Sequence, residues 1–401
     1  MEAYNRKFRL KEFYSFERHQ FSESWVNGEG IVIELKRVKK TCKCPSCGKN
    51  TRTRVETLQR QVRDLDVCGA KCSIEFSYYK IRCRCGYKGV EVLDFVDRYA
   101  RYTKRFEEKV MILCRVMTLK DVAEEVRMDW HSVKDIDKKH AKDYVTDLQQ
   151  AAPRKIGVDE IAYEKHHKYL TVVRDAESDK VIWVGKERKK ETLDQFFVQL
   201  GYAKCQAISV AVVDMWDPYI TSIHAHTNAQ IVFDKFHILK KVNETLDTIR
   251  KHEFAKADLQ ERKEMKHKRF LLLSRQKHLD EEKRESLYAL KEMNQNLYAA
   301  YLLKEQIADI FDEENAARAT QRLYRWMENV TKAGIGQFEK LLSMIKEHLT
   351  GILNYFEHKL TNAASEGLNN KINVIKRRAY GFRDLTYFIY KIYQICGIRS
   401  S

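Results

Sequence analysis

The 401-residue chain contains little proline and glycine, and these shortages exclude several classes of protein. Its 3 Pro and 15 Gly are too few for a collagen-like or Pro-rich chain, and we find no internal repeat. No apolar run approaches the roughly 18 residues of a membrane-spanning helix, and the first residues lead into no apolar segment typical of a signal peptide. We therefore expect a cytoplasmic protein that has no membrane partner.

Acidic residues are also in the minority. The chain has 74 Lys and Arg against 57 Asp and Glu, which gives a formal net charge of +17. Its hydrophobic content of 44% argues against disorder, and its length is sufficient for two or three domains. Nucleic acids, anionic membranes and acidic proteins all bind basic chains, and the charge favours nucleic acid among them.

Seven of the ten cysteines lie in residues 1–100. Because an intracellular chain keeps its thiols reduced, this block indicates metal binding rather than disulfides. The candidate ligands of a structural Zn²⁺ ion form two closely spaced pairs, and they are Cys44, Cys47, Cys83 and Cys85. Three further cysteines compete with them: Cys42, Cys68 and Cys72. The alternative is a set of small buried residues, because the second pair is compressed and follows the first after a long interval.

Residues 103–150 have the apolar spacing of three short helices, with Asp129 as the cap of the last one. This arrangement is typical of a helix-turn-helix, although any small helical bundle has a similar pattern. Trp130, Val133 and Ile136 are predicted to point inward. The side chains predicted to face DNA are His131, Lys134 and Lys138.

From residue 155 onward, apolar strands alternate with helices. Three of these strands run directly into an aspartate, namely Asp159, Asp214 and Asp234. One such carboxylate is commonplace as a helix cap, and Asp234 is suited to that role. Three within 76 residues indicate a site at the edge of a sheet.

A later polar helix carries Glu366 and Asn369 on one face, which continues into basic residues. A solvated helix face is the alternative interpretation. Together, Asp159, Asp214 and Glu366 offer hard oxygen ligands for two Mg²⁺ ions of the kind that flank a reacting phosphorus. A strand hairpin, further strands and later helices follow the order of a ribonuclease-H-like fold.

Several motifs in this half of the chain carry a resemblance to a known family. They are Gly157-Val158-Asp159-Glu160, Val213-Asp214-Met215-Trp216-Asp217-Pro218-Tyr219, Asp234-Lys235-Phe236-His237 and Ser365-Glu366-Gly367-Leu368-Asn369-Asn370-Lys371. In this order and spacing they resemble the DDE transposases of bacterial insertion sequences, and most closely the ISL3 family. The resemblance covers nearly the whole chain.

The resemblance implies that Asp159, Asp214 and Glu366 are the catalytic triad, with two Mg²⁺ or Mn²⁺ ions as cofactors. It matches Asp234 and His237 to an auxiliary D-x-x-H signature, in which His237 either contacts the scissile phosphate or stabilises the start of a helix. Asn369 is a further auxiliary candidate. The basic residues expected to contact DNA near the end of the chain are Lys376, Arg377 and Arg378.

The expected architecture is a multidomain α+β protein with a ribonuclease-H-like α/β catalytic core. The expected domains are a zinc-binding lobe (1–100), a helix-turn-helix (103–150), the first part of the core (155–250), an all-helical insertion (251–350) and the completion of the core with a basic tail (351–401).

The expected function is that of a transposase, which binds terminal inverted repeats and catalyses DNA cleavage and strand transfer. Its partners would be double-stranded DNA, both repeat and target, and at least one further copy of the chain, because two DNA ends must be held together. We expect it in the bacterial cytoplasm at the nucleoid. One alternative is a non-catalytic zinc-finger and helix-turn-helix regulator, and another is a metal-dependent nuclease that cleaves without joining.

Overall fold

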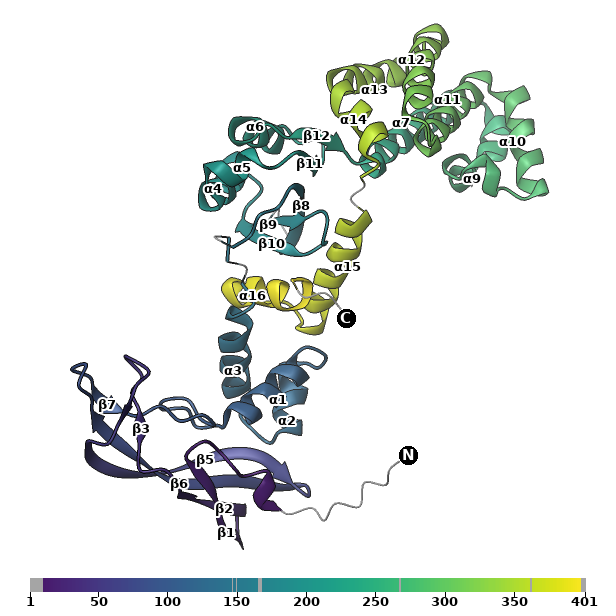
Figure 1. The fold of residues 1–401 in the computed structure, drawn as a ribbon. Helices are drawn as coiled ribbons and strands as arrows, with labels where there is room; N and C mark the ends of the chain where they lie inside the picture. The colour runs from purple at the N-terminus through teal and green to yellow at the C-terminus, as the bar shows by residue number, and fades with distance from the viewer. Residues whose placement is uncertain are drawn as a thin grey trace, which may run out of the picture. The chain divides into compact units, whose positions relative to one another are not determined.

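The computed structural model describes residues 10–145, 147–148, 150–164, 168–266, 268–360 and 363–397, without the side chains of residues 10, 264 and 363–366. The chain divides into two compact units, Met1–Asp143 and Tyr144–Ser401. Each unit has hydrophobic clusters of its own, and Figure 1 labels the elements of both.

The first unit begins with a strand-rich lobe. Its strands are β1 (His19–Asn27), β2 (Gly30–Arg37), β3 (Cys42–Lys43), β4 (Asn50–Thr51), β5 (Arg54–Val67), β6 (Ala70–Arg82) and β7 (Lys88–Val90), preceded by the 3-10 helix η1 (Leu10–Glu12). The main sheet has the order β1-β2-β6-β5, with β7 also paired to β6, while β3 and β4 form a separate pair. Ile33, Leu35, Ile74 and Phe76 are buried at alternate positions, because successive side chains of a strand point to opposite faces.

Three helices complete the first unit: α1 (Lys104–Cys114), α2 (Leu119–Glu125) and α3 (Trp130–Lys142). Each begins at a side chain that accepts a backbone hydrogen bond from its first turn, at Thr103, Thr118 and Asp129. The predicted cap at Asp129 is therefore confirmed. The buried side chains of the three helices form one small core.

The predicted inward orientation of Trp130 is wrong. Val133 and Ile136 are buried as expected, but Trp130 is 47% exposed. It is the first helical residue after the cap, so it lies at the end of the apolar stripe, where its ring stacks on His131 with centroids 3.7 Å apart. The spacing of apolar residues predicts which side chains share one face of a helix. It does not show how far the neighbouring helices extend over that face.

The second unit contains a mixed five-stranded sheet. Its strands are β8 (Lys155–Glu164), β9 (Lys168–Asp175), β10 (Val181–Lys186), β11 (Val210–Val213) and β12 (Gln230–Phe233). The order is β10-β9-β8-β11-β12, in which β8 to β10 are antiparallel and β11 runs parallel to both β8 and β12. With the helices that follow, this sheet confirms the fold class predicted from the sequence.

Many helices accompany this sheet. They are α4 (Lys190–Leu200), α5 (Tyr202–Gln206), α6 (Asp217–His226), α7 (Lys235–Lys256), α8 (Leu259–Met265), α9 (Arg269–Leu273), α10 (Glu281–Met293), α11 (Gln295–Asp312), α12 (Ala316–Ala333), α13 (Gly336–Glu347), α14 (Leu349–His358), α15 (Ala363–Arg378) and α16 (Leu385–Cys396), with the 3-10 helix η2 (Gln276–His278). None of the helices in the described part of the chain combines the length and apolarity needed to cross a membrane.

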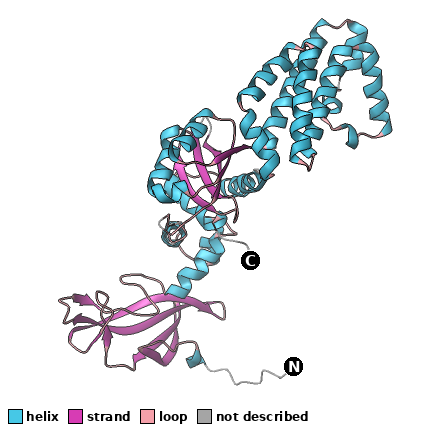
Figure 2. Cartoon of the chain, turned by 45° about the horizontal axis from the view of Figure 1, so that its top comes forward, coloured by secondary structure: helices cyan, strands magenta, loops and turns pink. Residues whose placement is uncertain are grey.

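Helices cover both faces of the sheet (Figure 2). Side chains of α4 and α6 share a hydrophobic cluster with Ile156, Val158 and Val173. On the other face, α15 and α16 pack against Leu170 and Val172. Successive side chains of one strand point to opposite faces of the sheet, and both faces are covered. The apolar strands of this sheet therefore do not alternate between apolar and polar residues.

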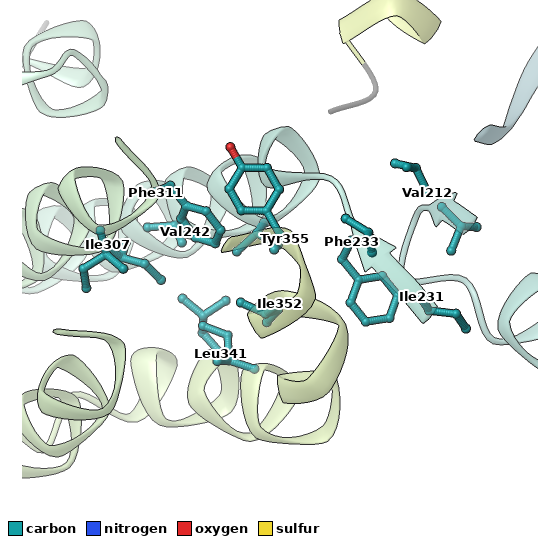
Figure 3. Packing of buried hydrophobic residues seen from close by; sticks show 14 of the residues in the cluster. Val212, Ile231, Phe233, Val242, Ile307, Phe311, Leu341, Ile352 and Tyr355 are labelled. Atoms are coloured by element: carbon teal, nitrogen blue, oxygen red, sulfur yellow. The ribbon is translucent and has the colours of Figure 1, made fainter. Parts of the chain in front are cut away.

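The sheet and the helices α7 to α14 share one continuous core. Helix α7 starts directly after β12, and α14 returns to pack against β12. Figure 3 shows Phe233 of β12 beside Ile352 and Tyr355 of α14, with Val242 and Phe311 farther along the same cluster. The strand that ends at Asp234 is therefore held in place by the helical segment.

Gly351→Ala is expected to destabilise the second unit, because a Cβ at this position of α14 would lie 2.4 Å from the ring of Phe233. Alanine normally stabilises a helix relative to glycine. Here we expect the opposite effect, because overpacking should lower the free energy of unfolding by about 1–3 kcal/mol. Thermal unfolding monitored by circular dichroism measures the effect. Gly336→Ala in α13 is the matched control, because its Cβ would meet nothing within 4 Å. Equal melting temperatures for the two variants would contradict the prediction.

Candidate catalytic and metal sites

Strand register brings three aspartates to the same edge of the second sheet. In the parallel pairs, Val212 of β11 lies opposite Gly157 of β8, and Val213 lies opposite Phe233 of β12. Continuing these registers by one or two residues places Asp214 beside both Asp159 and Asp234. The buried strands thus bring three carboxylates to the same edge of the sheet.

The prediction that a strand ends at Asp159 is wrong, whereas β11 and β12 do end just before Asp214 and Asp234. Strand β8 continues to Glu164, and Asp159 pairs with Val172 of β9. The apolar run stops at Asp159 because β11 no longer flanks β8 there, but β9 still supplies hydrogen bonds. Asp159 therefore lies within β8, with strand residues before and after it.

The carboxylate of Asp159 is oriented by two hydrogen bonds. The backbone N–H of Glu160 donates to Oδ1 at 2.8 Å, and Nδ2 of Asn369 donates to Oδ2 at 2.9 Å. Burial raises the pKa of Asp159 above its usual value, and these two bonds partly offset the shift. Asp214 is more open, with 30% of its side chain exposed, and Oδ1 accepts the backbone N–H of Met215 at 2.6 Å.

Asn369 belongs to α15, the polar helix that also contains Glu366. Leu368, Ile372 and Ile375 follow one another at i, i+4 and i+7, a spacing that predicts one apolar helix face, and they are buried against the sheet. Asn369 extends from the same helix to Asp159. Glu366 lies one turn earlier in α15, but its side chain is outside the described residues. Thr361 or Asn362 is the cap of this helix that the sequence predicts, and both also lie outside the described residues.

Asp234 and His237 lie at the start of α7. Asp234 is 3% exposed and caps the helix by accepting the backbone N–H of Phe236 at 3.2 Å. Nδ1 of His237 lies 3.7 Å from Oδ1 of Asp214. The cap therefore fixes the turn that places an imidazole beside the second candidate carboxylate.

Arg188 is a neighbour of the site that sequence reasoning missed. Its guanidinium lies 4.9 Å from the ring centroid of Tyr169 and 4.1 Å from that of Trp216, and Nη1 donates to Oε1 of Glu160 at 3.1 Å. Burial raises the pKa of Glu160, and the positive charge of Arg188 opposes that shift. The only signal in the sequence was a basic run before α4, and nothing in that run indicates a partner 28 residues away.

The candidate zinc ligands converge in the first unit. The Sγ atoms of Cys44, Cys47, Cys83 and Cys85 all lie within 4.8 Å of one another. The closest pairs across the group are Cys44 with Cys85 at 3.7 Å and Cys47 with Cys83 at 3.6 Å. A backbone hydrogen bond from Tyr87 lowers the pKa of Cys85 to about 6, which favours its thiolate at neutral pH. Four thiols so close together can hold one metal ion.

The two cysteine pairs sit in similar turns. The backbone N–H of Gly48 donates to the carbonyl of Cys44, and that of Gly86 donates to the carbonyl of Cys83, each at 3.0 Å. Both glycines have positive φ, +69° and +91°, a backbone conformation that other residues rarely adopt. This explains why a glycine follows each pair.

The three competing cysteines lie outside this group. Cys42 is buried and accepts a hydrogen bond from Nη2 of Arg37 at 3.5 Å. Cys72 is buried beside the hydroxyl of Tyr14, and Cys68 is exposed at the turn between β5 and β6.

The candidate DNA-contacting residues lie on two helices in different units. On α3, His131 is exposed in the first turn, while Lys134 and Lys138 are half-buried. On the last turns of α15, Nζ of Lys376 donates to the carbonyl of Ala162 at 2.9 Å, Arg377 is exposed and Arg378 is half-buried.

The melting temperature of Asp159→Asn, relative to that of wild type, is expected to rise with pH in buffer without added Mg²⁺. The raised pKa means that the folded state keeps the Asp159 proton to a higher pH than the unfolded state does. This contribution to stability is therefore lost as the pH rises from about 4, the unfolded value, through the folded pKa. We expect the melting temperature of the variant, relative to that of wild type, to be about 2–4 °C higher at pH 7.5 than at pH 4. A difference that does not vary with pH would contradict this explanation.

Comparison with known proteins gives a consistent result. The family model for ISL3-type DDE transposases, described as "Transposase", matches residues 156–392, and a second model, "Helix-turn-helix domain of transposase family ISL3", matches residues 91–141. The chain is 33% identical over 384 residues to the transposase for insertion sequence element IS1001 of Bordetella parapertussis, with 94% of each chain covered. It is 27% identical over 350 residues to the transposase for insertion sequence element IS1557 of Mycobacterium tuberculosis, covering 81% of this chain and 78% of that protein.

These matches confirm the helix-turn-helix and the family resemblance. A helix-turn-helix domain joined to a transposase domain implies DNA binding, and DDE chemistry implies divalent metal ions. With its mixed sheet, its convergent aspartates and its four-cysteine cluster, the chain belongs to the ISL3 family of DDE transposases.

Proposed function

We propose that this protein mobilises an insertion sequence by binding its terminal inverted repeats, cleaving the DNA at its ends and joining the freed 3′-hydroxyl groups to target DNA. The observation that carries the proposal is the hydrogen bond between Asp159 of β8 and Asn369 of α15, in a chain of this family. It brings the helix that contains Glu366 to the edge of the sheet where Asp159 and Asp214 converge.

In this proposal Asp159, Asp214 and Glu366 would hold two Mg²⁺ or Mn²⁺ ions, and the ions would supply charge to activate the attacking oxygen and to stabilise the leaving oxygen. The remaining roles belong to side chains that orient these ligands. The Glu160 N–H and Asn369 hold the Asp159 carboxylate, and Asp234 holds the first turn of α7. That turn presents His237 beside Asp214, where we assign it to the scissile phosphate.

In this proposal the first unit recognises the DNA. We assign a structural Zn²⁺ ion to Cys44, Cys47, Cys83 and Cys85. The zinc lobe and the helix-turn-helix are joined through the fully buried Asp64 of β5. Its Oδ1 accepts hydrogen bonds from Thr103 Oγ1 at 2.6 Å and Arg105 Nε at 2.8 Å. We therefore propose that both parts bind the repeat as one rigid reader, with His131, Lys134 and Lys138 on its recognition helix.

We further propose that the helices of residues 251–350 form an insertion within the catalytic core, and that Lys376, Arg377 and Arg378 contact the DNA backbone. Two ends must be joined in one reaction, so the active form is proposed to be a homodimer or a larger assembly on double-stranded DNA. Its place would be the bacterial cytoplasm, at the nucleoid.

The test is incubation of the full chain with labelled duplexes of its own terminal repeat and a target plasmid, in Mg²⁺. The expected products are DNA nicked at the repeat end and repeat strands covalently joined to the plasmid. Cleavage without joining would favour a nuclease, and binding without cleavage would favour a regulator.

Because phosphate contacts release counterions, the affinity of the chain for repeat DNA should fall about 10³-fold or more between 50 and 200 mM salt.

A further inference from the structure

Asn369 uses only one end of its amide within the described residues. Its Nδ2 donates to Oδ2 of Asp159 at 2.9 Å. Its Oδ1 is buried and has no hydrogen-bond partner among the residues that the structure describes. The assignment of nitrogen and oxygen follows from the partner, because a flipped amide would place its oxygen against the carboxylate oxygen of Asp159.

A buried acceptor without a partner costs about 1–3 kcal/mol and calls for a physical explanation. The described groups around this amide include Asp159, whose oxygens accept hydrogen bonds and cannot supply a proton when ionised. A buried oxygen that lies close to a carboxylate and lacks a donor can be satisfied by a cation. Asparagine carbonyl oxygens are ordinary ligands of Mg²⁺ and similar hard ions.

Glu160 Oε2 is a second buried oxygen near this edge of the sheet that lacks a hydrogen-bond partner among the described residues, but its situation differs. The other oxygen of that carboxylate, Oε1, already pairs with the guanidinium of Arg188 at 3.1 Å. A positive charge is therefore present beside Glu160. The amide of Asn369, by contrast, makes its one described hydrogen bond to a carboxylate and none to a cation, so Asn369 is the stronger candidate.

We propose that Asn369 is a further ligand of the catalytic metal site, in addition to the carboxylate triad. Its Nδ2 fixes Asp159, and its Oδ1 coordinates the divalent ion that Asp159 binds. In this role Asn369 completes the site by joining α15 to β8 across 210 residues of sequence. The inference rests on the proposed function, because it assumes that Asp159 is a metal ligand.

The competing explanation is that Asn369 only orients Asp159 through its N–H. Two substitutions separate the roles. Asn369→Ala removes both the donor and the oxygen, whereas Asn369→Asp removes the donor but keeps an oxygen ligand at the same distance along the side chain. Asn370→Ala is the matched control, because Asn370 is the next residue of the same helix and is exposed.

The experiment is a titration of the full chain with Mn²⁺, in which electron paramagnetic resonance reports the free ion and no DNA is present. We expect Asn369→Ala to raise the Kd for Mn²⁺ about 10- to 100-fold, while Asn369→Asp stays within about tenfold of wild type. Asn370→Ala should bind as wild type does. Thermal unfolding without added Mn²⁺ checks that each variant is folded.

Cleavage of the backbone by Fe²⁺ and peroxide gives a second readout on wild-type protein, since bound iron cuts the chain near its ligands. Cuts are expected near both Asp159 and Asn369. The inference is overturned if Asn369→Ala binds Mn²⁺ with wild-type affinity, if Asn369→Asp is as weak as Asn369→Ala, or if iron cuts near Asp159 but nowhere in α15. Failure of the proposed function is a separate result, namely wild-type protein that binds Mn²⁺ but neither cleaves nor joins repeat DNA.

Discussion

Asp214→Ala is expected to reduce both cleavage and strand transfer by about 10³-fold or more, because both steps use the same metal ions in the proposed function. Asp214 follows β11 directly and is 30% exposed, so its side chain contributes little to the core. Asp159→Ala should have a similar catalytic effect but a larger structural one, because Asp159 accepts hydrogen bonds from Glu160 and Asn369. Catalysis is measured by the joining of labelled repeat DNA to a plasmid in Mg²⁺.

The matched control for Asp214→Ala is Asp217→Ala. Asp217 is an exposed aspartate three residues later, at the start of α6. It should change joining by less than about tenfold, because it lies outside the proposed ligand set. Both variants should bind repeat DNA about as tightly as wild type, since the first unit is unchanged. Joining by Asp214→Ala at a rate near that of the control would remove Asp214 from the catalytic site.

Loss of zinc is expected to have the second large effect, on the structure of the first unit. Removing one proposed ligand by Cys44→Ser should lower the zinc content from the proposed one ion per chain to well below one. Structural Zn²⁺ contributes about 10–16 kcal/mol in zinc-finger peptides, which is more than the stability of most domains. We therefore expect the ends of β3, β4, β6 and β7 to unfold, and affinity for repeat DNA to fall about 10³-fold toward non-specific binding.

Zinc content is measured by mass spectrometry of the metal, and DNA binding by fluorescence anisotropy. Cys68→Ser is the matched control, because Cys68 is an exposed cysteine of the same unit outside the four-cysteine group. It should retain one ion and wild-type affinity. A Cys44→Ser variant with full zinc content would show that another residue holds the ion, and Cys42 would then be the first candidate.

Local patterns in the sequence were sufficient for much of the fold. The cap at Asp129, the hairpin of β9 and β10, the buried face of α15 and the strands that end at Asp214 and Asp234 all follow from neighbouring residues. The family motifs added the order of the domains. Both errors lie at the ends of predicted segments. Trp130 is exposed at the end of the apolar face of its helix, and β8 continues past Asp159.

The sequence by itself determined which residue types are available to this protein: paired cysteines followed by glycines, aspartates after apolar strands, and a helix with Glu and Asn on one face. Only the tertiary structure decided how they combine. It joined the two cysteine pairs, set Asp159 against Asn369 and paired Glu160 with Arg188. These contacts depend on strand register and on the packing of helices from distant parts of the chain, which local spacing does not specify.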